Sequence, residues 1–219
     1  MNPLLIRRRG MMKARQGGMI PIAWLQGSPT PGETWINTGI KGLNTISVEG
    51  AFINNGQGVS TENNWIFGSR TTNDQTSYFA LLIFNSTLSG FSWRRGSNAS
   101  LPTHPNDNEE VLFSNIVDLN KLVLTYNNNT FTVVGSTAYQ GNNSDIGLFT
   151  NISANGLPST TNPSDSVKLE WIKFYDSGIL VRDFIPVRVG TVGYMYDRVS
   201  GQLFGNAGTG DFVLGPDVI

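Results

Sequence analysis

Hydrophobic and polar positions alternate with a period of two over much of this chain. The pattern is clearest in residues 121–126 and 130–134, which an Asn-rich segment at 127–129 separates. Successive side chains of a strand point to opposite faces, so this alternation predicts a half-buried hairpin. Residues 78–84 form a nearly continuous apolar run instead, which is typical of a strand that is covered on both faces.

The most regular strand pattern lies in residues 167–212. Two short polar turns, Asp176-Ser177-Gly178 and Val199-Ser200-Gly201, each separate apolar runs. Asp, Ser and Gly favour turns, so consecutive hairpins are expected here. The parity shared by residues 167, 169 and 171 breaks at Ile172 and Phe174, which predicts either a bulge or a strand that is covered on both sides.

Taken together, the patterns predict an all-β protein. Roughly a dozen strands, with turns about every 8 to 12 residues, indicate a sandwich or a barrel. Twelve Phe, five Trp and six Tyr can fill the space between two curved sheets. We expect one domain over residues 19–219, preceded by a separate segment at residues 1–18.

The segment at residues 1–18 is basic. Its five positive charges precede the first acid of the chain, Glu33, and belong to Arg7, Arg8, Arg9, Lys13 and Arg15. We expect the segment to be either a disordered tail, or one that is ordered only by a partner, or an arm that docks on an acidic, partly apolar protein surface. It lacks interleaved aromatic residues, so we expect no nucleic-acid partner.

Composition narrows the possible chemistry. The chain has no Cys, which excludes disulfides, thiolate metal sites and a Cys nucleophile. One His, His104, offers little for a zinc site or a Ser-His-Asp triad. No apolar run approaches the roughly 20 residues of a membrane span, and no signal-peptide pattern is seen, so we expect no membrane insertion and synthesis without a leader.

A family resemblance lies in residues 171–187, which read WIKFYDSGILVRDFIPV. They resemble the terminal motif of laminin-G-like, concanavalin-A-like jelly-roll domains, in the version found in phages of gut Bacteroidales, including crAss-like phages, and in their hosts. GYMYD at 193–197 and NAGTG at 206–210 are similar to the next two parts of that motif. WINTG at 35–39 and FGSR at 67–70 are similar to earlier strands of the family.

The resemblance implies a two-sheet antiparallel jelly-roll sandwich that serves recognition or virion structure. On this basis we predict a non-enzymatic virion protein of a phage: a head-fibre, decoration or tail-appendage component, assembled in the host cytoplasm. The basic arm would attach it to other virion proteins. A homo-oligomer such as a trimer, and adhesion to a surface glycan, are expected. The alternative is a bacterial carbohydrate-binding module.

Paired carboxylates would indicate a glucanase, because glucanases share the fold that the resemblance implies. Such enzymes place acids at alternate positions of one strand, facing one groove. Asp165, Glu170 and Asp176 do not have that spacing, and the adjacent Glu109 and Glu110 would face opposite sides of a strand. We therefore predict no catalytic residue and no enzyme activity.

Calcium is the one metal that the sequence leaves open. Residues 106–110 read NDNEE and supply hard oxygen ligands. Calcium needs six or more oxygens in a suitable geometry, and a solvated turn has the same composition. No metal-binding residue is therefore predicted.

Sugar binding depends on aromatic faces and polar side chains that read hydroxyl groups. The candidates are Trp65, Trp93, Arg94 and Arg95. The alternative is that both Trp side chains are core or interface residues, because Trp is usually largely buried. For the Arg182-Asp183 pair we expect a structural role, as an ion pair or a turn clamp.

Overall fold

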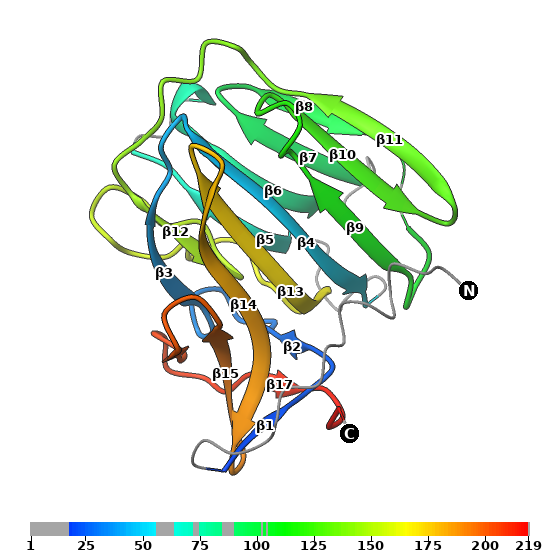
Figure 1. Ribbon diagram of the computed structural model, residues 1–219, viewed down its shortest axis with the longest axis vertical. Helices are drawn as coiled ribbons and strands as arrows, with labels where there is room; N and C mark the ends of the chain where they lie inside the picture. Colours follow the sequence, from blue (N-terminus) through cyan, green and yellow to red (C-terminus); the bar gives the residue numbers. More distant parts are fainter. Residues whose placement is uncertain are drawn as a thin grey trace.

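Two antiparallel sheets pack face to face in the computed structural model, which describes residues 18–55, 64–71, 75–84, 90–101, 103 and 105–218 (Figure 1). The described residues contain one short 3-10 turn, Gln75–Ser77, and no α-helix. The predicted all-β, two-sheet antiparallel sandwich is therefore confirmed. No helix in the described part of the chain is long and apolar enough to cross a membrane.

The large sheet has eleven strands. They are β1 (Met19–Pro21), β2 (Leu25–Gln26), β4 (Ile46–Asn54), β9 (Glu110–Ser114), β10 (Lys121–Tyr126), β11 (Asn129–Val134), β13 (Val167–Asp176), β14 (Ile179–Val189), β15 (Val192–Asp197), β16 (Gln202–Phe204) and β17 (Val213–Leu214). Its main order is β11-β10-β9-β4-β13-β14-β15-β16, with β1 on β14 and with β2 between β13 and β17. The central strands β4 and β13 pair along their whole length.

The small sheet has six strands in the order β3-β12-β5-β6-β7-β8. They are β3 (Ile36–Lys41), β5 (Asn64–Ser69), β6 (Phe79–Phe84), β7 (Gly90–Arg95), β8 (Asn98–Leu101) and β12 (Asp145–Leu148). In Figure 1, β5, β6 and β7 lie behind β4, β9 and β13 of the large sheet. Each sheet thus has one face toward the shared core and one outer face.

The three predicted hairpins are confirmed, as β10–β11, β13–β14 and β15–β16. Asn127 and Asn128 join β10 to β11 with positive φ angles of 49° and 57°. Ser177 and Gly178 join β13 to β14 with φ angles of 51° and 80°. Two-residue hairpin loops of this kind need left-handed backbone at both positions, and Asn and Gly tolerate it best.

Aromatic rings from both sheets fill the core. Phe67 of the small sheet lies at the centre, with its ring centroid 5.5 Å from that of Phe79 and 6.4 Å from that of Trp93. Across the sandwich it meets Phe113 and Phe174 of the large sheet at 6.1 and 6.0 Å. Burial of such rings is the main stabilisation that joins the two sheets.

A bulge interrupts β13 between Leu169 and Trp171, where the pairing with β4 shifts register. The sequence left open either a bulge or a strand that is covered on both sides, and the structure shows the bulge. Leu169 and Ile172 both face the core and are fully buried. Trp171 is turned to the outer face of the large sheet, although the simple parity of the sequence placed it with Leu169.

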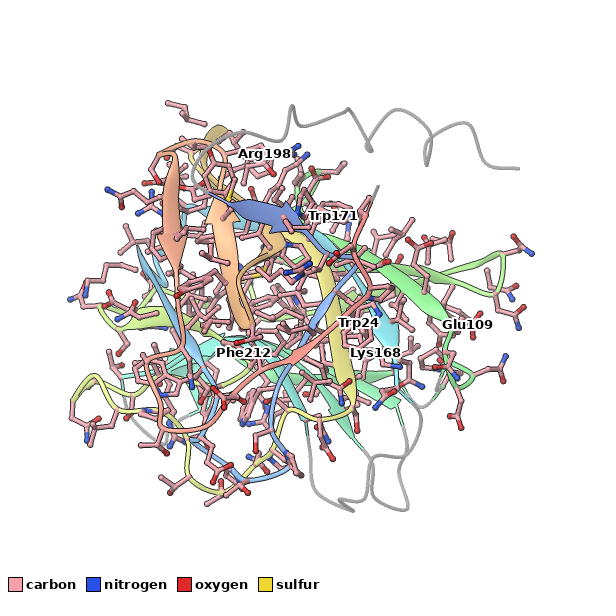
Figure 2. All side chains as sticks on the ribbon, turned by 90° about the horizontal axis from the view of Figure 1, so that it is seen from below. Trp24, Glu109, Lys168, Trp171, Arg198 and Phe212 are labelled. Atoms are coloured by element: carbon pink, nitrogen blue, oxygen red, sulfur yellow. The ribbon has the colours of Figure 1, made fainter. Side chains whose placement is uncertain are left out.

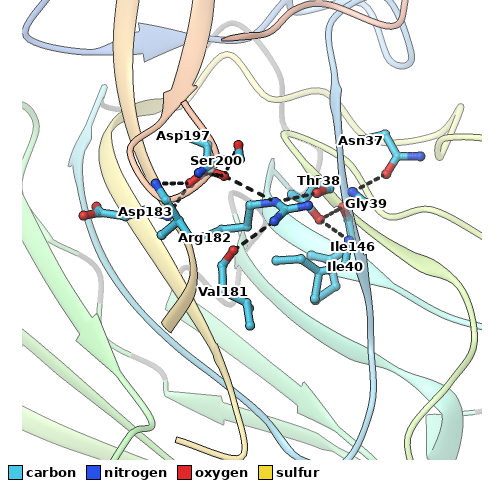
Figure 3. Close-up of polar contacts among 11 residues, drawn as sticks. Asn37, Thr38, Gly39, Ile40, Ile146, Val181, Arg182, Asp183, Asp197 and Ser200 are labelled. Carbon is cyan, nitrogen blue, oxygen red and sulfur yellow. Dashed lines mark hydrogen bonds and ion pairs between the residues drawn. The ribbon is translucent and has the colours of Figure 1, made fainter. Parts of the chain in front are cut away.

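A buried carboxylate organises the turn from β15 to β16 (Figure 3). The Asp197 side chain is fully buried and accepts hydrogen bonds from the Asp183 amide at 2.8 Å and from the Ser200 hydroxyl at 2.6 Å. Arg182 Nε lies 3.7 Å from Asp197 Oδ2 and also donates to the Thr38 carbonyl of β3. Asp183 in turn forms an ion pair with Arg198. Arg182 and Asp183 therefore have the clamp role that the sequence predicted.

Residues 1–17 of the predicted basic arm lie outside the described residues. This holds for every predicted attachment residue, namely Arg7, Arg8, Arg9, Lys13 and Arg15. The domain boundary at residue 18 and the attachment role both stay predictions.

Candidate functional site

The predicted residues Trp93 and Arg95 lie in the core. They sit at alternate positions of β7 and are 0% and 2% exposed. The Arg95 guanidinium donates to the carbonyls of Ile46 and Asn44 and lies 4.9 Å from the Tyr139 ring centroid. Burial lowers the pKa of Arg95 to about 10. These contacts favour the core interpretation, and ligand binding by the two residues stays a prediction.

Trp65 and Arg94 come together on the outer face of the small sheet. The Arg94 guanidinium lies 5.3 Å from the Trp65 ring centroid and 5.1 Å from that of Tyr78. Burial lowers the pKa of Arg94, and Trp65 is only 2% exposed. The sheet separates this pair from Trp93 and Arg95, so the four candidates do not form one site. The role of Trp65 and Arg94 in ligand binding also stays a prediction.

An open depression of about 400 Å³ lies on the outer face of the large sheet. It is bounded by β4, by the end of β13 with its turn, and by the segment that joins β9 to β10. Its lining residues are Thr45, Ser47, Glu49, Ile116, Leu119, Tyr175, Ser177 and Gly178. Hydroxyl groups, one carboxylate, one aromatic ring and aliphatic side chains therefore face the same space.

Glu49 is the polar centre of the depression. Its Oε1 atom accepts hydrogen bonds from the Tyr175 hydroxyl at 2.9 Å and from Lys173 Nζ at 3.0 Å. Side-chain exposure is 16% for Glu49 and 20% for Lys173, so this ion pair is partly shielded from solvent. Both of these bonds reach Oε1, and among the described residues none is seen at Oε2. A carboxylate oxygen in this state can accept a hydrogen bond from a ligand hydroxyl.

Pairing between β4 and β13 brings these groups together. Glu49 lies opposite Lys173, and Ser47 lies opposite Tyr175. Side chains at alternate positions share a face, so all four point away from the core. The contacting side chains hold one another in place before any ligand arrives.

Aliphatic side chains border the depression. Ile116 and Leu119, from the segment that follows β9, both line it, and Ile116 is 41% exposed. Exposed apolar groups beside hydroxyl and carboxylate groups suit a ligand that has both apolar and polar faces. A pyranose ring, with C–H groups on its faces and hydroxyls around its edge, is such a ligand.

Sequence reasoning did not identify Glu49 or Tyr175. Tyr175 belongs to the motif at residues 171–187, in which the sequence points only to the turn at Asp176 and to the Arg182-Asp183 pair. Glu49 is a single acid in a weakly alternating segment. The available signal was that polar residues stand at alternate positions of each strand, 47 and 49 on β4 and 173 and 175 on β13. These residues form a site only because the two strands pair.

The possible calcium loop is a compact turn. Glu109 Oε2 accepts a hydrogen bond from the Asn106 amide at 2.7 Å, and Asn108 has a φ of 61°. Within the described ranges, no group of three or more His, Cys, Asp and Glu side chains is placed to hold a metal ion. These contacts favour the solvated-turn interpretation. His104 lies outside the described residues.

Comparison with known proteins supports the fold. No family model and no curated protein sequence matches the chain. A solved structure of a proposed carbohydrate binding protein from Bacteroides ovatus has a TM-score of 0.57 at 9% identity, covering 91% of this chain. The chain spans 62% of the length of that protein. The likeness places this chain among β-sandwich proteins.

Two further solved structures are similar at lower TM-scores. The CBM40 domain of the Ruminococcus gnavus IT-sialidase, bound to α2,6-sialyllactose, has a TM-score of 0.41 at 12% identity and covers 70% of this chain and 92% of its own. The leech intramolecular trans-sialidase has a TM-score of 0.38 at 13% identity and covers 72% of this chain and 25% of its own. None of the three structures is named as a phage protein or as a laminin-G-like domain, so that more specific assignment stays a prediction.

Proposed function

We propose that this chain is a non-catalytic carbohydrate-binding protein whose ligand occupies the depression at Glu49 and Tyr175. The observation that carries the proposal is the contact between these two side chains at the centre of an open, partly apolar depression. The proposal corresponds to the alternative in the sequence analysis, a carbohydrate-binding module. The fold shared with the proposed carbohydrate binding protein from Bacteroides ovatus supports it.

The lining groups offer complementary contacts to one sugar ring. Oε2 of Glu49 accepts a hydrogen bond from a ring hydroxyl, and the hydroxyls of Thr45 and Ser47 donate or accept as needed. Ile116 and Leu119 contact the C–H face of the ring. Because the depression is open to solvent, binding to a single ring should be weak, and several copies on one surface would raise the avidity.

Catalysis is not part of the proposal. Glycoside hydrolysis generally needs two carboxyl groups about 5 to 9.5 Å apart on either side of the bond. Of the residues described as lining the depression, Glu49 is the only acid, and it is already paired with Lys173. The arrangement suits holding a sugar and lacks a second acid for cleaving it.

The virion role remains a separate proposal. Attachment through the basic arm, a homo-oligomeric state and display on a phage rest on the family resemblance, and no described residue tests them. The same depression would serve adhesion in either setting. Mass spectrometry of purified virions tests the phage setting, and absence of the protein there would contradict it.

A glycan array tests the binding proposal. The full chain should bind a subset of immobilised glycans, and calorimetry with one bound glycan should give a measurable Kd. Tyr175→Ala should weaken that binding at least tenfold. Tyr78→Phe, on the opposite sheet, serves as a control and should leave it unchanged. An array without signal, or equal binding by Tyr175→Ala, would contradict the proposal.

A further inference from the structure

The bulge in β13 gives the outer face of the large sheet a second aromatic ring. Regular alternation after Leu169 would direct Trp171 into the core, whereas the bulge turns it outward and leaves it half-buried. Lys173 Nζ lies 5.3 Å from the Trp171 ring centroid, which fixes the indole beside the Glu49–Lys173 pair. Bulges are frequent beside functional sites because they re-aim a side chain in this way.

A third ring lies at the other end of the same strand. Trp24 immediately precedes β2, which pairs with β13 at Lys168. Its half-buried indole lies 5.1 Å from Lys168 Nζ, and Lys168 also reaches Asn108 Oδ1 at 3.4 Å. Figure 2 shows Trp24 and Lys168 next to each other, with Trp171 farther along the large sheet.

The three rings follow β13 from one end to the other. Lys168 and Tyr175 are seven residues apart, which is roughly 23 Å along a strand at about 3.3 Å per residue. This length is several times the width of one pyranose ring. A single sugar that fills the depression at Tyr175 would not reach Trp171 and Trp24.

Charge along this face favours a neutral ligand. Glu49 is the one charged group among the described residues that line the depression, and it would repel a carboxylate placed there. Glu49 also neutralises Lys173. Lys168, whose amine lies beside the Trp24 ring and reaches the amide oxygen of Asn108, has a further N–H group to donate to a hydroxyl of the ligand.

From these positions we infer that the site takes a linear, neutral oligosaccharide of several rings, laid along β13 from Tyr175 past Trp171 to Trp24. The inference rests on the proposed function and adds the length and the charge class of the ligand. Aromatic rings spaced along a strand stack on successive sugar rings, and the hydroxyls between them meet Glu49, Lys173 and Lys168.

A length series tests the inference. The affinities of linear β-glucan and mannan oligosaccharides, from disaccharide to hexasaccharide, are measured by calorimetry on the full chain, together with an oligouronate of matched length. Affinity for at least one neutral series should rise with each added ring up to about the pentasaccharide. Trp24→Ala should weaken hexasaccharide binding about tenfold and leave disaccharide binding unchanged. Tyr175→Ala should weaken both.

Two controls keep the outcome interpretable. Trp24→Phe keeps an aromatic ring and should restore most of the hexasaccharide affinity. Tyr78→Phe, beside the opposite sheet, should change nothing. Affinity that is independent of length, or equal loss of both ligands in Trp24→Ala, would overturn the extended site while leaving the proposed function in place. Preference for the oligouronate would overturn the neutral class, and failure to bind any oligosaccharide on the array or in solution would contradict the proposed function itself.

Discussion

Tyr175 donates its phenolic hydroxyl to Glu49 Oε1 at 2.9 Å, and this bond joins residues that are 126 positions apart in the chain. Tyr175 lies directly opposite Ser47, so its ring leans diagonally across the strand pair to reach Glu49. Lys173 donates to the same oxygen from the position opposite Glu49. The site therefore depends on the register of two central strands, and the core that fixes this register also fixes the site.

Glu49→Gln should weaken glycan binding about tenfold, which corresponds to about 1.4 kcal/mol. The substitution keeps an acceptor for the Tyr175 hydroxyl but removes the charge that strengthens a hydrogen bond from a ligand hydroxyl. Asp145→Asn is the matched control, because it removes another partly exposed carboxylate that pairs with a lysine, Lys41. Calorimetry measures the glycan affinity of both variants. Equal losses of affinity would show a general charge effect instead of a contact between Glu49 and the ligand.

Arg95→Ala should lower the free energy of unfolding by about 3 kcal/mol, because it leaves a cavity and two carbonyls that lose their donors. Arg94→Ala, on the half-buried outer face, should cost about 1 kcal/mol. Urea denaturation followed by far-UV circular dichroism measures both. A similar decrease in the free energy of unfolding for the two variants would contradict the assignment of Arg95 to the core.

Asp165→Asn should stabilise the protein by about 1 kcal/mol at neutral pH. The Asp165 carboxyl is buried, its Oδ1 atom has no hydrogen-bond partner, and burial raises its pKa. A raised folded-state pKa favours the protonated form in the folded state. In the wild type, the protonated Asp165 carboxyl therefore contributes its full stability below the unfolded-state pKa of about 3.9. This contribution is lost as the pH rises through the folded-state pKa.

The advantage of Asp165→Asn over the wild type should accordingly shrink as the pH falls toward about 4. Thermal melting at a series of pH values measures the difference. An advantage that stays constant with pH would show that ionisation of Asp165 has no part in it.

Asp197→Asn should have the opposite sign and cost about 2 kcal/mol at neutral pH. Burial by itself raises the pKa of Asp197, but the hydrogen bonds from Asp183, Ser200 and Val199 outweigh it and lower the pKa overall. A lowered folded-state pKa gives stability that is present above the unfolded-state pKa and is lost as the pH falls through the folded value. The stability of the wild type should therefore fall more steeply with decreasing pH than that of Asp197→Asn. Parallel curves of stability against pH would contradict this role of the Asp197 carboxylate.

Much of the fold could be predicted from local patterns. Asn127-Asn128 and Ser177-Gly178 indicate their hairpins because few other residue pairs accept left-handed backbone at both positions. The parity that breaks at Ile172 signals the bulge. That signal does not show which residue is extra, because the register is set by pairing with β4, more than a hundred positions earlier.

The site could not be predicted in the same way. Trp93, Arg94 and Arg95 are consecutive on one strand, so alternation alone separates Arg94 from the other two. Arg94 lies next to Trp65 only because the strands are ordered β5-β6-β7, and local sequence patterns do not predict this order. The contact between Glu49 and Tyr175 likewise exists only once β4 and β13 are neighbours. Sequence candidates chosen by residue type therefore fell on the small sheet and in the core, while the depression lies on the large sheet.

Indole N–H resonances offer the most direct test of where the ligand binds. The chain has five Trp residues, and Trp→Phe variants assign each signal in a ¹⁵N-labelled sample of the full chain. During titration with a bound linear oligosaccharide, the signals of Trp171 and Trp24 should shift, while those of Trp65 and Trp93 should stay in place. Shifts at Trp65 with none at Trp171 would place the ligand on the small sheet and contradict the account.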